Sequence, residues 1–214
     1  MRMITSFAYV GFTSPASGEW RTFGTEVLGA QLADRSDGAV GLRLDDLAER
    51  IVVHPGERND VAYVGWDCGD APGLADSVAR VRNAGFDVVD DAEAAAVRHV
   101  VALAAFVDPW GFRHELTHGL AEVGSFVPGR AMSGFLTGDQ GLGHLVFVLP
   151  DLDAGMSFYL DTLGFLLSDH IEMGMSLRFL HCNHTNPELH DAAVRARVEA
   201  AGFALAAQGE RVAL

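Results

Sequence analysis

Hydrophobic and polar positions recur along this chain in similar blocks. Residues 8–12 (AYVGF) are repeated almost unchanged at 62–66 (AYVGW), and residues 143–147 (GHLVF) form a third, weaker copy. All three runs are short and rich in aromatic and β-branched residues, which predicts a strand in each. A segment that recurs in this way indicates an internal structural repeat.

Each of these runs is followed by a segment whose apolar residues have helical spacing. The apolar stripes cover residues 20–28, 74–81 and 156–163, which predicts a helix in each copy. In the first and third copies a glycine follows the helix at the same distance, 20 residues after Tyr9 and 20 residues after His144. Glycine is a common helix end, so the copies match in position as well as in composition.

Strand candidates complete each unit. They cover residues 41–44, 50–54, 97–106 and 112–116. Residues 108–111 (DPWG), between the last two candidates, predict the turn of a hairpin. The repeating unit is therefore a strand, a helix and a few antiparallel strands, about 55 to 65 residues long, which exceeds the length of ordinary solenoid repeats.

Charge and composition exclude several kinds of partner. The chain has 29 acidic and 15 basic residues, a formal net charge of -14, and such a surface repels phosphate backbones and anionic membranes. Cys68 and Cys182 are too few for a disulfide framework or a cysteine zinc site. The sequence shows neither a signal-peptide pattern nor an apolar run of about 18 residues. We therefore expect a soluble cytoplasmic protein that binds neither nucleic acid nor membranes.

Four motifs point to one family of enzymes. Residues 133–144 (SGFLTGDQGLGH), 159–169 (YLDTLGFLLSD) and 179–183 (FLHCN) form three blocks in order, and residues 108–116 (DPWGFRHEL) form another in the first half. These blocks resemble the type I extradiol (catechol ring-cleavage) dioxygenases of the vicinal oxygen chelate (VOC), or glyoxalase, superfamily. The resemblance is to 2,3-dihydroxybiphenyl 1,2-dioxygenase-like enzymes in particular.

The resemblance implies an α+β fold built of tandem βαβββ modules. We expect a first VOC domain of two modules over residues 1–122, a linker over 123–140 and a catalytic VOC domain over 141–214. The likeness in motifs covers residues 1 to about 183. Only 74 residues follow position 140, and the family's later blocks are not recognisable among them, so we expect a complete first domain and a truncated catalytic domain.

The resemblance also implies a metal centre. Enzymes of this family hold mononuclear Fe(II) with two His and one Glu, which leaves open positions for a catecholate and O2, and a further His moves protons. By its place in the GLGHLVF motif, His144 is the first iron ligand; the alternative is a half-buried strand histidine bonded to the backbone. Counterparts of the other two ligands and of the proton-transfer His are not recognisable, so the catalytic residues are unknown.

The first domain is expected to be a structural duplicate without a metal. Tyr9 and Tyr63 stand at the positions that correspond to His144, and Glu115 lies on the last strand. Two phenols and one carboxylate do not make a two-His-one-carboxylate site. The histidines of this domain are therefore expected to be surface or packing residues: His54, His99, His114 and His118.

The end of the chain has two open interpretations. Residues 192–201 predict a helix that is either the remnant of a fourth module or an unrelated tail. His181, His184, Glu188 and His190 lie near one another in the sequence, and we expect a polar loop there and not a metal site. An incomplete second domain leaves apolar faces uncovered, which predicts a homo-oligomer.

Three hypotheses about function remain open from the sequence. By resemblance, the chain is an oxidoreductase that cleaves a bicyclic catechol with O2 in aromatic-compound catabolism. The alternatives are a non-catalytic VOC protein that acts in binding or assembly, and a VOC dimer that sequesters a small molecule. A complete ligand triad would distinguish the enzyme from the others, and the sequence does not specify the catechol.

Overall fold

The computed structural model describes residues 4–138, 141–143, 145–172 and 176–181. These residues belong to two compact units, of which the first extends to Phe147 and the second begins at Val148. Among the described residues, no helix is long and apolar enough to cross a membrane.

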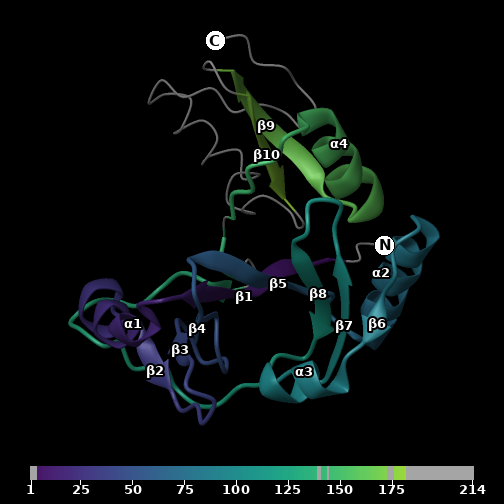
Figure 1. The fold of residues 1–214 in the computed structure, drawn as a ribbon. Helices are drawn as coiled ribbons and strands as arrows, with labels where there is room; N and C mark the ends of the chain where they lie inside the picture. Colours follow the sequence, from purple (N-terminus) through teal and green to yellow (C-terminus); the bar gives the residue numbers. More distant parts are fainter. Residues whose placement is uncertain (1–3, 139–140, 144, 173–175, 182–214) are drawn as a thin grey trace, which may run out of the picture. The chain divides into compact units, whose positions relative to one another are not determined.

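The first unit is built on one eight-stranded sheet with the strand order β2-β3-β4-β1-β5-β8-β7-β6 (Figure 1). The strands are β1 (Ser6–Ser14), β2 (Gln31–Ala33), β3 (Val40–Arg43), β4 (Ile51–Pro55), β5 (Asp60–Asp67), β6 (Val89–Asp90), β7 (Ala102–Val107) and β8 (Arg113–His118). In each half the first strand is parallel to the last, β1 to β4 and β5 to β8. Strands β1 and β5 join the halves in antiparallel register. The two halves thus confirm the predicted pair of repeats and the α+β fold.

The repeated pentapeptide has a packing role at this central seam. Tyr9 pairs with Gly65 across the strands, and Tyr63 pairs with Gly11. A Cβ atom at either glycine would overlap the tyrosine ring opposite. Both tyrosines are buried, and their rings meet edge to face with centroids 6.0 Å apart. Each copy of the repeat therefore supplies a ring to the other copy and the space for the other copy's ring.

The helices of the first unit lie where the apolar stripes predict them. The first half has η1 (Ser17–Glu19), α1 (Trp20–Thr22) and η2 (Phe23–Leu28), and Gly29 ends this stretch with a φ of 86°. The second half has α2 (Ala71–Asn83), whose N-cap Asp70 accepts a hydrogen bond from the Gly73 amide at 2.8 Å. Gly85 follows α2 with a φ of 92°.

The predicted strand over 97–106 is correct only in its second half. Helix α3 (Ala92–Val97) occupies the start of this range, and β7 begins at Ala102. The Asp91 side chain caps α3 by accepting from the Ala94 amide at 2.9 Å, and the alanine-rich sequence that follows has a high helix propensity. His99 then turns the chain with a φ of 56°.

The second unit contains α4 (Leu152–Ser157), η4 (Phe158–Thr162) and a hairpin of β9 (Leu166–Glu172) and β10 (Ser176–His181). The predicted helix and the helix-ending Gly164, with a φ of 75°, are confirmed. Its described core is a small aromatic and aliphatic cluster of Phe158, Tyr159, Leu163 and Phe165, all buried.

The expected strand over 143–147 is not formed by its described residues. Leu145 and Phe147 lie in a segment without strand pairing. A segment becomes a strand only where a neighbouring strand bonds its backbone, and β1 reaches this part of the chain only at Gly141 and Leu142.

Candidate functional site

A buried polar cluster lies where the two halves of the first unit meet. Glu115, on β8, is fully buried. One of its carboxylate oxygens accepts the Tyr9 hydroxyl at 2.9 Å and the Arg98 Nε at 3.2 Å, and the other accepts the Arg113 Nε at 3.0 Å. The carboxylate is therefore surrounded by donors from β1, from the end of α3 and from β8 itself.

Tyr63 extends the cluster on the other side of Arg98. The Arg98 guanidinium carbon lies 3.6 Å from the centroid of the Tyr63 ring, a cation–π contact. The Tyr63 hydroxyl is 3.0 Å from Nε2 of His54. Burial lowers the pKa of His54, and the Arg98 charge lowers it further. Burial raises the pKa of both Tyr9 and Tyr63, so both phenols keep their protons at neutral pH.

The donor set of this cluster does not fit iron. A facial-triad Fe(II) site takes two imidazoles and a carboxylate, whereas Glu115 here accepts from the protonated Tyr9 phenol and the Arg98 guanidinium, and Tyr63 packs against that guanidinium. An arginine already supplies the positive charge that a metal would bring. Within the described part of the chain, no group of three or more His, Cys, Asp or Glu side chains could hold a metal ion.

The predicted iron ligand, His144, lies outside the described residues. The same is true of His184, Glu188, His190 and the predicted helix 192–201. Their roles stay predictions.

A second buried group in the first unit centres on His114. This histidine is fully buried, and its Nδ1 accepts the indole N–H of Trp66 at 2.9 Å. Its Nε2 lies 3.1 Å from Oδ2 of Asp108. An Nδ1 that accepts leaves the proton on Nε2, so the ring is neutral and donates to Asp108. This fits the expectation of a packing histidine.

Sequence reasoning missed two residues of these groups. Arg98 lies inside the range predicted as a strand, and Asp108 was interpreted only as a turn residue. A weak signal for Asp108 was present, because an Asp six residues before a strand histidine can serve as the partner of its ring. No comparable signal exists for Arg98, whose contacts with Tyr63 and Glu115 depend on the tertiary fold.

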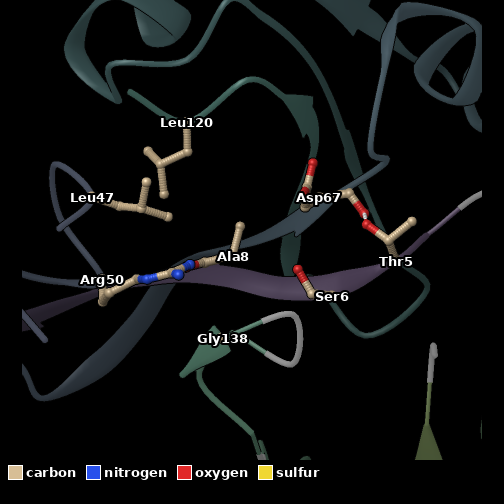
Figure 2. Close-up of a pocket in the computed structure, with 8 residues that line it drawn as sticks. All are labelled: Thr5, Ser6, Ala8, Leu47, Arg50, Asp67, Leu120 and Gly138. Atoms are coloured by element: carbon tan, nitrogen blue, oxygen red, sulfur yellow. Dashed lines mark hydrogen bonds between the residues drawn. The ribbon is translucent and has the colours of Figure 1, made fainter. Parts of the chain in front are cut away.

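The first unit also has a pocket of about 310 Å³, shown in Figure 2. It is lined by Thr5, Ser6, Ala8, Leu47, Arg50, Asp67, Leu120 and Gly138. The Arg50 guanidinium donates to the Asp45 carboxylate at 2.6 and 2.8 Å and to the Ala8 carbonyl at 2.7 Å. Its charge is therefore already paired within the protein, and the pocket has no chemistry of its own that would define a catalytic site.

Comparison with known proteins identifies the family. Residues 7–56 match the family Dihydroxybiphenyl dioxygenase BphC D1, and residues 141–211 match the Glyoxalase/Bleomycin resistance protein/Dioxygenase superfamily. The second match extends beyond position 183, where the recognisable motifs end.

Individual relatives agree with these matches. The chain is 43% identical over 199 residues to the biphenyl-2,3-diol 1,2-dioxygenase of Metapseudomonas furukawaii, covering 89% of this chain and 66% of the relative. It is also 43% identical to the enzyme of that name from Paraburkholderia xenovorans (strain LB400), over 89% of this chain and 67% of the relative. A crystal structure of BphC, a halotolerant catechol dioxygenase, superposes with a TM-score of 0.82 at 45% identity, covering 85% of this chain and 62% of that one. The chain thus spans about two thirds of the length of these curated relatives, and it belongs to the extradiol dioxygenases of the vicinal oxygen chelate superfamily.

Proposed function

We propose that this chain serves the extradiol cleavage of a catechol by O2, with Fe(II) bound by a ligand set that includes His144. The observation that carries the proposal is the 43% identity to biphenyl-2,3-diol 1,2-dioxygenases along 89% of the chain. A relative from Rhodococcus jostii, 34% identical, is named an iron-dependent extradiol dioxygenase. Bound Fe(II) would supply a centre to which two adjacent phenolic oxygens and O2 can bind together.

The first unit has a supporting part in this proposal. Its central cluster contains a buried guanidinium and protonated phenols, which suits a scaffold and not a second metal site. We accordingly assign residues 1–122 to a metal-free VOC domain, 123–140 to a linker and 141–214 to the metal-binding domain. The superfamily match over 141–211 supports the last assignment.

The proposal also includes a setting for the protein. We place it in the cytoplasm, because its two cysteines and acidic composition suit a reducing, aqueous compartment. We assign it a homo-oligomeric state, because Leu136 and Val146 are 106% and 77% exposed in the single chain and a second copy would cover such apolar side chains. Light scattering coupled to gel filtration measures the mass directly, and a monomer at micromolar concentration would contradict the assignment.

Anaerobic reconstitution with Fe(II) tests the proposed activity. Oxygen uptake with biphenyl-2,3-diol, together with a yellow ring-opened product, is expected at one iron per chain. His144→Ala should abolish iron retention and turnover, whereas His118→Ala, a half-buried histidine of the first unit, should preserve both. A wild-type chain that retains no iron and forms no product would contradict the proposal and favour a binding or assembly role.

A further inference from the structure

Five aromatic side chains form a continuous row through the first unit. The centroid of Phe7 lies 5.3 Å from that of Trp66, and Trp66 stacks on His114 at 6.2 Å with an interplanar angle of 16°. His114 lies 5.9 Å from Phe147, and Phe147 lies 4.8 Å from Phe112. This aromatic row joins β1, β5 and β8 to Phe147, which lies more than 25 positions after β8 along the chain.

The middle of the aromatic row is fixed by hydrogen bonds. The His114 ring is held on one side by the Trp66 indole and on the other by Asp108. The second oxygen of Asp108 accepts the backbone amides of Trp110 and Phe112 at 2.9 and 2.8 Å. Because His114 and Asp108 are buried and bonded on both sides, the ring against which Phe147 packs has a defined plane.

The backbone of Phe7, the first residue of the row, contacts the same segment of chain at its other end. The Phe7 carbonyl accepts the Leu142 amide at 2.9 Å, and Gly141 forms a parallel bridge with Phe7. Gly141 has a φ of 66°, and a Cβ atom there would overlap the Phe7 carbonyl. The first unit therefore holds the chain at 141–142 by its backbone and at Phe147 by its ring.

We infer that the aromatic row and its Asp108 hydrogen bonds are a positioning device of the first unit that anchors the segment 141–147 on both sides of His144. The inference rests on the proposed function, in which His144 is an iron ligand. Phe147 and His114 are positioning residues here and touch no reacting atom. The first unit thereby gains a task in the proposed reaction, which is to hold the segment that bears His144.

Hydrogen exchange measured by mass spectrometry tests the anchor without any metal. In Phe147→Ala and in Gly141→Ala, the Leu142 amide, which donates to the Phe7 carbonyl, should exchange about tenfold faster. The first change removes a ring contact of the segment, and the second places a Cβ atom against that carbonyl. The control is Phe126→Ala, which removes an equally half-buried ring that packs on Phe135 at 5.9 Å, away from the row. Unchanged exchange in both test variants, with tryptophan fluorescence confirming that they are folded, would overturn the inference.

Cobalt(II) titration tests the consequence for the metal site. The Co(II) dissociation constant should rise about 10- to 100-fold in Phe147→Ala and Gly141→Ala but not in Phe126→Ala, and the visible absorption of bound Co(II) should change in the two test variants. If exchange accelerates while Co(II) affinity and spectrum stay unchanged, the positioning role is refuted. If the wild-type chain takes up no Co(II), the proposed function fails, and the exchange rates alone decide whether the row anchors the segment.

Discussion

Removal of the Arg98 charge should destabilise the first unit by leaving Glu115 with too few partners. Glu115 has no exposed side-chain surface, and the Arg98 side chain is only 11% exposed. Loss of one partner of a buried pair costs about 3–5 kcal/mol, because the remaining charge stays out of water. Arg113 keeps one contact with Glu115 at 3.0 Å but is 36% exposed, so solvent screens its help. For Arg98→Met we therefore expect the lower end, about 3 kcal/mol.

Urea unfolding followed by tryptophan fluorescence measures this cost in the first unit alone. The three tryptophans of the chain, Trp20, Trp66 and Trp110, all belong to this unit. With a typical dependence of about 2 kcal/mol per molar urea, the midpoint of Arg98→Met should fall by roughly 1.5 M.

A double-mutant cycle separates the buried charge from lost packing. Glu115→Gln removes the charge but leaves an oxygen that can accept the Tyr9 hydroxyl. The double variant Arg98→Met, Glu115→Gln should therefore be more stable than Arg98→Met alone, because no unpaired charge remains. A cost below about 1 kcal/mol for Arg98→Met, or full additivity in the cycle, would refute the view that Arg98 compensates Glu115.

Three further predictions concern titrating side chains. The hydrogen bond from Arg35 holds the pKa of Asp37 at about 2, so the stability that Asp37 contributes is present above about pH 4 and is lost as the pH falls through 2. Because this side chain is 42% exposed, Asp37→Asn should cost less than about 1 kcal/mol at neutral pH in urea unfolding. The cost should be smaller at pH 2, where the carboxylate of the folded state is about half protonated. Burial raises the pKa of Tyr63, so the Tyr63 phenol loses its proton in the unfolded state at a lower pH than in the folded state. The free energy of unfolding should therefore decline as the pH rises above about 10. Urea midpoints compared from pH 8 to 11 should fall less steeply in Tyr63→Phe than in the wild-type protein. Burial raises the pKa of the Cys68 thiol to about 11. In a Cys182→Ser background, its reaction with a disulfide reagent at pH 8 should therefore be about 100-fold slower than that of an ordinary thiol. A rate near that of an ordinary thiol would contradict the burial of Cys68.

The repeat could be predicted from sequence because its signal is local and occurs twice. The shared AYVG tetrapeptide encodes a ring and the space for a ring at a separation of two residues, and the seam of β1 and β5 requires both in each copy. Helix ends were equally predictable, since Gly29, Gly85 and Gly164 each adopt a positive φ that favours glycine. Such features depend on neighbours along the chain.

Features that depend on distant partners could not be predicted in the same way. Arg98 has no local pattern, and its position under Tyr63 follows from the turn after α3, which the strand prediction over 97–106 concealed. The expected strand over 143–147 is not formed by its described residues for a related reason, because a β-rich composition favours a strand but does not provide the partner that would pair with it.

The topology of the first unit explains why its buried carboxylate is paired with an arginine. Strand β5 pairs with β1 on one side and with β8 on the other, and this arrangement brings the hydroxyl of Tyr9 within 2.9 Å of Glu115. A carboxylate buried at this place needs a positive partner, and here Arg98 supplies it permanently from within the chain. His144 stands at the position that corresponds to Tyr9 in the third copy of the repeat. A neutral imidazole is a common metal ligand, whereas the protonated phenol of Tyr9 donates to Glu115. Under the proposed function, the residue on the first strand would therefore decide whether a guanidinium or a metal is the cation of its module.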